Sequence, residues 1–449
     1  MKLLKCMLKP LVYLLRRIQK VLFNASMKDI DKSIERWTWE RYKRIKSDIE
    51  RSNQLVNATT LNKVVSGEKI KVGILFQIPS AWASVESVWH ALICDCRFET
   101  KVYIYDAEQK EKAQMAGARD FLKEHNIPYV VVDNYTLADD PPHILFYQTP
   151  WDDAHRPKWL QSDTVSKLGI RIAYIPYGLN YSASVWKDYV FSDLKLHAYP
   201  WRIFTYSNRM RFDHICLSPR GGDNVVALGH PKFDSLVDKK SFKLEEDVRL
   251  RINGRKVVLI QMHFAATDGN NAIPEADIHS YIEFLKNANR YPNLFFLLRP
   301  HPKMLEMYHK KGMDDVVEEF TALLELHENV CSYDYPDYRP ALFAADAVVG
   351  DRSALLIEAG ALRIPVLYMT NYYYKETMLP AIAPLFDSYY QGSFSYDIER
   401  FVEMVILKGL DYKKSMREDA LKICLPEIDG KCGLRIVNYI ADEIVNERN

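Results

Sequence analysis

The chain has 449 residues, more than the roughly 250–300 residues over which a single hydrophobic core keeps growing, so we expect two domains. Hydrophobic residues make up 48% of the sequence and charged residues 27%, a composition that excludes a largely disordered chain. With 60 Lys and Arg against 59 Asp and Glu, no overall positive charge indicates a nucleic-acid partner.

The seven cysteines are scattered along the chain and include no Cys-x-x-Cys pair. An odd, dispersed set of thiols is typical of a reducing compartment, and we expect the cytoplasm. No His and Cys spacing supplies the four ligands of a zinc site, so we expect no structural metal.

The first 26 residues alternate apolar residues with cations, and no acidic residue precedes Asp29. The cations are Lys2, Lys5, Lys9, Arg16, Arg17 and Lys20. Because these charges interrupt every window, no stretch reaches the ~20 apolar residues that span a bilayer. The pattern favours an amphipathic helix on an anionic membrane, which predicts a peripheral protein of the cytoplasmic face. The alternative is a helix whose apolar stripe packs on the rest of the protein.

Residues 1–66 thus form an N-terminal segment, which includes a polar stretch of helical pattern at Asp31–Asn53. Strand-like apolar runs then alternate with helical patterns. The runs are 71–76, Lys101–Tyr105, Tyr129–Val132, Ile144–Tyr147, Arg171–Ile175, Ile203–Tyr206 and Asn224–Leu228. Runs that are apolar on both faces and separated by helices indicate a parallel sheet covered on both sides. We expect a Rossmann-like acceptor domain over residues 67–237.

A second alternating series follows a charged segment and predicts a second Rossmann-like domain over residues 238–449. Its strands are expected at Val257–Gln261, Leu294–Leu298, Val330–Tyr333, Ala347–Gly350 and Val366–Met369. The last helix, Leu434–Asn446, could return to the first domain. Open parallel sheets bind ligands beyond the carboxyl ends of their strands, so we expect the site in a cleft between the two domains.

One candidate site directly follows the strand expected at Leu294–Leu298. Arg299-Pro300-His301-Pro302 is held out of helical geometry by its two prolines. A guanidinium there can bind phosphate through two hydrogen bonds, and the imidazole can donate a hydrogen bond or a proton. We predict that Arg299 binds phosphate and that His301 is catalytic. The alternative is an exposed turn with solvated side chains.

A second candidate is the loop Gly350-Asp351-Arg352-Ser353, which leads into a helix expected at Ala354–Leu362. Ser353 is predicted as the N-cap of this helix, whose first N–H groups, from Ala354 onward, carry a partial positive charge that suits a diphosphate. Arg352 adds a further positive charge. The alternative is a plain capped helix, and no Gly-x-Gly-x-x-Gly or Walker sequence supports a known phosphate loop.

The first domain offers candidate bases and acceptor-binding residues in three loops that follow strands or close the domain. The candidate bases, in falling order of preference, are His230, Asp152, Asp153 and His155, and the candidate acceptor residues are Tyr177, Gly178, Asp153 and Lys232. Carboxylates and imidazoles can orient a hydroxyl group or remove its proton. Asp pairs in loops are more often turn formers, which is the alternative for Asp152 and Asp153.

The order of several motifs resembles a known family. The motifs are Gly-His-Pro-Lys-Phe-Asp at 229–234, Met262-His263 after a strand, Arg-Pro-His-Pro at 299–302, Gly-Asp-Arg-Ser at 350–353, Arg-Ile-Pro-Val-Leu-Tyr at 363–368 and Asp-Gly-Lys-Cys-Gly-Leu-Arg-Ile-Val at 429–437. Together they are similar to the CDP-glycerol glycerophosphotransferases of teichoic-acid and capsule synthesis, over about half of the chain, residues 224–440.

The resemblance implies a GT-B architecture, with two Rossmann-like domains facing a cleft and the CDP-linked donor held by the second domain without metal or other cofactor. It places Arg299, His301, Asp351 and Ser353 around the donor phosphates. Arg352 takes the place of one of the family's two adjacent hydroxyls. The family's His-Gly pair, thought to supply the base, corresponds here to Tyr177-Gly178.

The sequence therefore predicts a phosphotransferase of the EC 2.7.8 type that moves glycerol phosphate, or a related polyol phosphate, from a CDP-activated donor to a surface polymer or lipid-linked primer and releases CMP. One alternative is a GT-B glycosyltransferase or sugar-nucleotide epimerase that uses a UDP- or GDP-sugar. Another is a non-catalytic scaffold in a polysaccharide assembly complex.

Overall fold

The computed structural model describes residues 40, 42–52, 54–55, 68–106, 115, 117–182, 194–217, 220–264, 276–373 and 377–446. The stretch 1–26, expected to bind membranes, lies outside these residues. Within them, no helix is long and apolar enough to cross a bilayer. Residues 42–52 are helical, as expected within 31–53, and Ile45 and Ile49 pack against Ala198.

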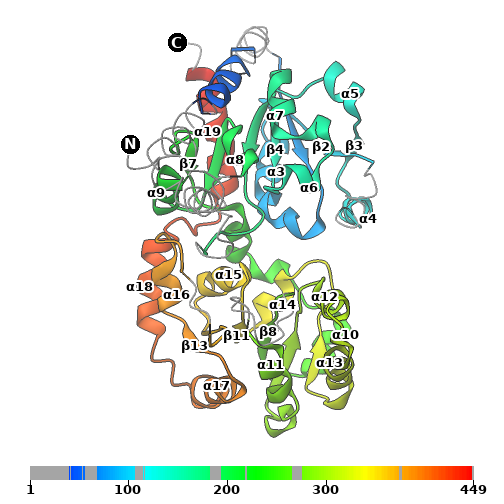
Figure 1. Cartoon of the computed structure of the whole chain (residues 1–449), viewed down its shortest axis with the longest axis vertical. Coiled ribbons are helices and arrows are strands. Elements are labelled where there is room, and N and C mark those ends of the chain that lie inside the picture. Colours follow the sequence, from blue (N-terminus) through cyan, green and yellow to red (C-terminus); the bar gives the residue numbers. More distant parts are fainter. Residues whose placement is uncertain are drawn as a thin grey trace, which may run out of the picture. The chain divides into compact units, whose positions relative to one another are not determined.

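The chain forms two compact units (Figure 1). Of the described residues, unit 1 contains those up to 178, 194–234 and 429–446, and unit 2 contains 179–182 and 235–428. The chain thus enters unit 2 after Asp234, close to the expected change at 237/238. It returns to unit 1 at Asp429, so the last helix lies in unit 1, which is the return that the sequence left open for Leu434–Asn446.

Unit 1 is built on a seven-stranded parallel sheet with the order β3-β2-β1-β4-β5-β6-β7. The strands are β1 (Ile70–Leu75), β2 (Phe98–Ile104), β3 (Tyr129–Val131), β4 (Ile144–Tyr147), β5 (Arg171–Tyr174), β6 (Arg202–Thr205) and β7 (Val225–Ala227). The helices are α3 (Glu86–Ile93), α4 (Ala118–Glu124), α5 (Asn134–Asp139), α6 (Asp152–His155), α7 (Ser162–Val165), α8 (Lys195–Ala198), α9 (Asn208–Leu217) and α19 (Cys432–Asn446). Both β4 and β5 are buried along their whole length, as expected for central strands covered on both faces.

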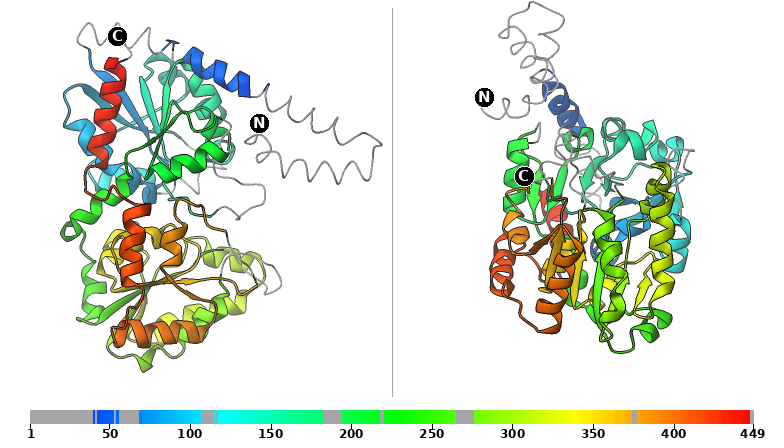
Figure 2. Two further views of the ribbon diagram at one scale, coloured as in Figure 1. Left: turned by 90° about the vertical axis from the view of Figure 1, so that its left-hand side faces the viewer. Right: turned by 60° about the horizontal axis from the view of Figure 1, so that its bottom comes forward.

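The last helix, α19, completes the core of unit 1 and lies over the sheet beside α3 (Figure 2). Its buried face, which includes Ile436 and Ile440, packs with Val72 and Ile74 of β1. At its start, the Asp234 carboxylate accepts hydrogen bonds from the N–H groups of Cys432 (3.0 Å) and Gly433 (2.8 Å). These bonds satisfy two N–H groups that a helix leaves unpaired at its N-terminus.

Unit 2 contains a six-stranded parallel sheet with the order β10-β9-β8-β11-β12-β13. The strands are β8 (Lys256–Gln261), β9 (Leu294–Leu298), β10 (Val330–Ser332), β11 (Ala347–Gly350), β12 (Val366–Met369) and β13 (Tyr390–Gly392). The helices are α10 (Glu246–Ile252), α11 (Ile278–Leu285), α12 (Met304–Lys310), α13 (Asp314–Leu326), α14 (Arg339–Ala344), α15 (Leu355–Ala361), α16 (Ala383–Asp387), α17 (Ser395–Phe401), continued by a π-helix (Val402–Leu407), and α18 (Lys414–Cys424). Two parallel Rossmann-like α/β units confirm the expected fold class.

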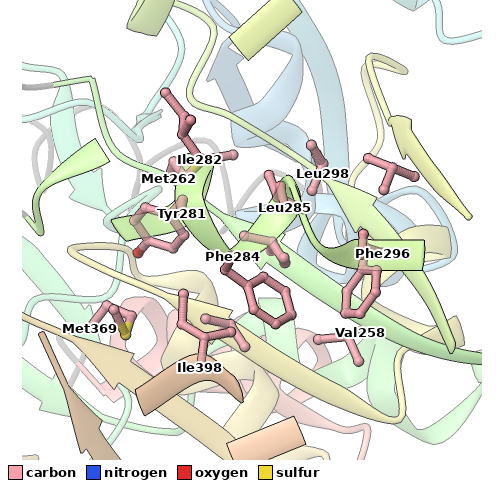
Figure 3. Close-up of a cluster of buried hydrophobic side chains, with 14 of the residues drawn as sticks. Val258, Met262, Tyr281, Ile282, Phe284, Leu285, Phe296, Leu298, Met369 and Ile398 are labelled. Atoms are coloured by element: carbon pink, nitrogen blue, oxygen red, sulfur yellow. The ribbon is translucent and has the colours of Figure 1, made fainter. Parts of the chain in front are cut away.

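One face of the unit 2 sheet is covered by α11, α13 and α17, whose apolar side chains form a continuous core with the strands (Figure 3). Phe284 of α11 packs edge-on against Phe296 of β9, with ring centroids 5.2 Å apart. On the other face, α14 contacts β8, and α15 contacts β11 and β12. Because both faces are packed, polar side chains can be presented at the ends of the strands.

Candidate active site

Three chain segments meet at the carboxyl edge of the unit 2 sheet, where they leave β8, β9 and β11. In the sheet order, β8 lies between β9 and β11. The extension of β8 bonds to both neighbours: the N–H of His301 donates to the Met262 carbonyl (2.8 Å), and the N–H of Asp351 donates to the Gln261 carbonyl (3.3 Å). We call His263, Phe264, His301, Asp351, Ser353 and Ala354 the strand-end site. It lies at the topological switch point, where open α/β sheets bind ligands.

Asp351 is the buried carboxylate of the strand-end site, with 3% of its surface exposed. One carboxylate oxygen accepts a hydrogen bond from the N–H of His263 (2.8 Å), which fixes the extension of β8 against β11. The preceding residue must be small, because a Cβ atom at Gly350 would lie 2.9 Å from the Gln261 carbonyl oxygen. Asp351 therefore positions His263 and the loop around it.

The His301 ring lies beside two other rings of the strand-end site. Its centroid is 4.6 Å from that of Phe264 and 5.5 Å from that of His263. Its Nδ1 accepts the N–H of Lys303 (3.1 Å), so in the neutral imidazole the proton is on Nε2. Burial lowers the pKa of His301 to about 4, with smaller contributions from His263 and Lys303. At neutral pH His301 is thus an uncharged hydrogen-bond donor.

The guanidinium of Arg299, which was predicted to bind phosphate, instead donates hydrogen bonds to backbone carbonyls of this chain. Its Nη1 donates to the carbonyls of Tyr333 (3.0 Å) and Tyr335 (2.8 Å), and its guanidinium lies 5.5 Å from the centre of the Tyr333 ring. Burial lowers the pKa of Arg299. The guanidinium holds the segment after β10 in place, which argues against a phosphate-binding role for Arg299.

The loop from Asp351 to Ala354 leads into α15, which begins at Leu355, one residue later than expected. Ala354 directly precedes α15 and has a helical backbone (φ −62°, ψ −23°), and Ser353 contributes its Oγ, which accepts the N–H of Leu355 (3.2 Å). Within the described part of the chain, the N–H groups of Ser353 and Ala354 have no acceptor. These two donors, with half-buried Arg352 beside them, suit an anionic ligand.

Sequence reasoning missed His263 and Phe264 of the strand-end site, and it did not single out Tyr281, a buried residue of α11 that interacts electrostatically with Asp351. His263 and Phe264 follow β8 directly, and the rule that singled out His301 and Ser353 could have found them. Tyr281 gave no such signal, because it lies within the apolar pattern of α11 (Figure 3). Its hydroxyl is buried and has no hydrogen-bond partner among the described residues, and burial, with a contribution from Asp351, raises the pKa of Tyr281 well above its ordinary value.

In unit 1, the polar residues that follow β4 bond to one another. The guanidinium of Arg156 is fully buried, donates to Asp152 Oδ1 (2.8 Å) and Thr149 Oγ1 (2.8 Å), and lies 4.3 Å from the centre of the Tyr147 ring. The second oxygen of Asp152 accepts both the N–H and the hydroxyl of Ser162. The carboxylate of Asp152, a predicted base, is thus enclosed in an ion pair, and the structure gives it a structural role.

The neighbouring candidates Asp153 and His155 differ from Asp152. The Asp153 side chain is 80% exposed and lies 3.6 Å from Lys195 Nζ. The carbonyl of His155 accepts hydrogen bonds from Gln77 Nε2 (2.6 Å) and the Tyr105 hydroxyl (2.8 Å), while its half-buried ring lies edge-on to Trp151. These contacts fix the backbone of His155 and leave Asp153 on the surface.

His230, the preferred candidate base, is fully engaged within unit 1. Its Nε2 donates to the Pro176 carbonyl (2.8 Å), and its Nδ1 accepts the N–H of Lys232 (3.3 Å). Burial, with a contribution from the Lys232 charge, lowers the pKa of His230 to about 3. Both imidazole nitrogens are thus engaged within unit 1, which argues against His230 as the base.

The motif that contains His230 also bonds to the motif at 429–437. Besides the bonds from Cys432 and Gly433 to Asp234, Arg435 Nε donates to the Leu228 carbonyl (2.9 Å). Two of the motifs that carry the family resemblance therefore hold α19 in unit 1. Lys232 is also buried, with 7% of its surface exposed.

Tyr177 and Gly178 follow β5. The N–H of Tyr177 donates to the Gln148 carbonyl (2.9 Å), and burial raises the pKa of its phenol, opposed by a hydrogen bond with Trp151. A Cβ atom at Gly178 would meet no other atom within 4 Å, so space does not require glycine there. Among the described residues, no group of three or more His, Cys, Asp or Glu side chains could hold a metal ion.

No protein-family model matches the sequence, and no curated protein sequence matches it. Solved structures with the same fold include the UDP-GlcNAc 2-epimerase of Neisseria meningitidis bound to UDP-GlcNAc, with 16% identity, a TM-score of 0.57, and coverage of 83% of this chain and 100% of that chain. The Methanocaldococcus jannaschii UDP-GlcNAc 2-epimerase in complex with UDP-GlcNAc and UDP has 13% identity, a TM-score of 0.56, and coverage of 83% and 99%. The wall teichoic acid polymerase TagF has 12% identity, a TM-score of 0.54, and coverage of 92% and 98%. These likenesses show that the chain has the GT-B-type fold of these enzymes.

Proposed function

We propose that the protein is a transferase that moves a glycerol-phosphate or related polyol-phosphate unit from a CDP-linked donor to a hydroxyl group of a surface polymer or lipid-linked primer. The observation that carries this proposal is the strand-end site. There a neutral imidazole with its proton on Nε2 and two N–H groups without acceptors among the described residues lie on neighbouring segments of one sheet edge. These are donors for a diphosphate.

In the proposed reaction, the acceptor oxygen attacks the phosphorus that bears the polyol. The bond from this phosphorus to the bridging oxygen breaks, and that oxygen leaves with CMP. Phosphoryl transfer needs positioning and charge stabilisation more than covalent help from the protein. The Nε2–H of His301 and the N–H groups of Ser353 and Ala354 would donate to the diphosphate oxygens, with Arg352 nearby. Asp351 would act through His263, whose backbone it holds.

Two further parts of the proposal rest on the sequence. The ordered motifs resemble glycerophosphotransferases, and TagF, named as a wall teichoic acid polymerase, shares the fold over 92% of this chain. Residues 1–26 would hold the enzyme on the cytoplasmic face of the membrane, near a lipid-linked acceptor. Of the four candidate proton acceptors for the attacking hydroxyl, Asp153 and His155 stay in the proposal, because Asp152 and His230 are both engaged within unit 1.

A second candidate function is that of an enzyme using a UDP-sugar, either an epimerase or a glycosyltransferase. It is favoured by the solved neighbours that are named as UDP-GlcNAc 2-epimerases and hold UDP-GlcNAc. Such an enzyme would use the same strand-end donors, since it also binds a diphosphate.

A nucleotide panel tests the two candidates. We expect CDP and CDP-glycerol to raise the thermal unfolding temperature of the purified protein more than UDP, UDP-GlcNAc or GDP, because a ligand stabilises the state that it binds. We also expect CMP release from CDP-glycerol in the presence of an acceptor primer. Stabilisation by UDP or GDP compounds alone would favour the second candidate. Binding of no nucleotide would contradict both and favour a scaffold.

A further inference from the structure

A second ligand site is suggested by a cavity of about 540 Å³ within unit 2 that is not part of the strand-end site. The C-terminal end of α15, one side of α18 and the residues that follow Asp234 form it. Its apolar lining consists mainly of Leu236, Val237, Leu362, Leu421, Leu425 and Ile428. The volume lies in the range of about 300–1,000 Å³ that is typical of small-molecule sites, which are mainly apolar with a few polar groups.

The polar groups of the cavity are mostly cations. Lys239, Arg363 and Lys422 line it, against one carboxylate, that of Glu418. Lys422 is paired with Asp419 (2.9 Å), whereas within the described residues no carboxylate lies within ion-pair distance of Lys239 or Arg363. Burial and the nearby charge of Arg363 both lower the pKa of Lys239. Two like charges that face one partly enclosed space would be stabilised by an anion.

Arg363 occupies a backbone position that favours glycine. Its φ of 63° lies in the left-handed region, just after α15 ends, where glycine is the usual residue. The conformation is fixed on both sides, because the N–H of Arg363 donates to the Gly360 carbonyl (2.8 Å) and its carbonyl accepts from the buried Arg417 (3.2 Å). Arginine is less favourable than glycine in such a position, because its Cβ atom crowds the backbone. The sequence thus keeps a cation at the rim of the cavity against a local preference.

We propose that this cavity binds an amphiphilic anion, a phosphate group joined to an apolar chain. Lys239 and Arg363 contact the phosphate, and the leucine-rich lining contacts the apolar part. Such a ligand is a lipid-like phosphate, and its apolar chain is needed for binding. The site is independent of the donor site in the proposed transfer reaction.

Calorimetric titration of the full-length protein tests this proposal with three probes: dodecyl phosphate, glycerol 3-phosphate and the uncharged dodecyl maltoside. We expect dodecyl phosphate to bind and dodecyl maltoside not to bind. Glycerol 3-phosphate should bind more weakly than dodecyl phosphate because it lacks the apolar chain, and equal binding of the two would contradict an amphiphilic ligand. Lys239→Ala and Arg363→Gly should each weaken the binding of dodecyl phosphate at least tenfold.

The variants separate lost binding from lost folding. Arg363→Gly removes the charge and relieves the left-handed backbone, so its thermal unfolding temperature should equal or exceed that of the wild type. Lys240→Ala removes the adjacent charge, which does not line the cavity, and should leave the affinity within twofold. Unchanged affinity in Arg363→Gly and Lys239→Ala, no binding of either phosphate, or equal binding of dodecyl maltoside would overturn the proposal.

Discussion

The two units share a sheet topology but use the ends of their strands in opposite ways. Around the switch point, β2-β1-β4 in unit 1 corresponds to β9-β8-β11 in unit 2. In unit 1 the polar side chains after β4 bond to one another, and Asp152 and Arg156 form a buried ion pair. In unit 2 the segments after β8, β9 and β11 present rings and N–H groups. The topology sets where a site can be, and the local hydrogen bonds decide whether its side chains remain available for a ligand.

The largest effect is expected from breaking the internal pair of unit 1. Asp152→Ala leaves the Arg156 charge buried without its carboxylate, which should lower the free energy of unfolding by about 3–5 kcal/mol. Denaturant unfolding measures this change. The matched control is Asp153→Ala, which alters an exposed carboxylate one residue away and should change stability by less than about 0.5 kcal/mol. If Asp152→Ala kept full stability but lost activity, Asp152 would be the base after all.

The next effect concerns the donors of unit 2. His301→Ala removes the Nε2–H donor, and we expect turnover of CDP-glycerol to fall by on the order of 10²–10³, as for other transition-state hydrogen-bond donors. The thermal unfolding temperature should change little, because the His301 ring is only partly buried. His309→Ala, which removes an exposed imidazole on α12, is the control and should retain turnover. Wild-type turnover in His301→Ala would remove His301 from the mechanism.

A smaller effect concerns the pH dependence of stability. We expect the free energy of unfolding to fall more steeply with decreasing pH in unit 1 than in unit 2. His230 has a folded pKa of about 3 and His214 one of about 4, both lowered mainly by burial, whereas an unfolded histidine titrates near 6.5. Below pH ~6.5 the unfolded state binds protons that the folded state does not, so stability is present above this pH and is lost as the pH falls. Each of these two histidines should remove about 2 kcal/mol between pH 7 and pH 5, whereas in unit 2 His301 is the one described histidine whose pKa is lowered in this way.

Hydrogen exchange measured at both pH values can assign this loss to a unit. Amides of β5 and β6 should lose more protection at pH 5 than amides of β9 and β11. His230→Gln, which can keep one of the two hydrogen bonds of the imidazole, should make the pH dependence of unit 1 shallower. Equal losses in both units, or an unchanged slope in the variant, would contradict this explanation.

The sequence was sufficient to predict most strands of the two sheets. The central strands β4, β9, β11 and β12 occupy the expected residues, because strands buried on both faces are continuous apolar runs. The edge strand β13 was missed, since Tyr390-Gln391-Gly392 is short and polar and has no apolar period. Helices α12 and α18 were also missed: α12 has only 7 residues, whereas the 11 residues of α18 do carry an amphipathic pattern that could have been found.

The candidate site was predictable only in part. His301, Asp351 and Ser353 could be placed at one edge because each follows a parallel strand. The engagement of Arg299 depends on carbonyl groups 34 and 36 residues away, and that of His230 on a carbonyl 54 residues away. No local pattern reports such partners. The same applies to Tyr281, whose place near Asp351 follows from the packing of α11 on the sheet.

The place of α19 bears on the order in which the protein can fold during synthesis. The ribosome releases residues 68–234 of unit 1 before residues 235–428 of unit 2, but their apolar face lacks Ile436, Val437, Ile440 and Ile444 until α19 has been made. Among the residues that the structure describes, the last strand of unit 2 ends at residue 392 and its last helix ends at residue 424. The domain made first should therefore mature last, and a chaperone that shields the exposed face of β1 and α3 would be most useful during that delay.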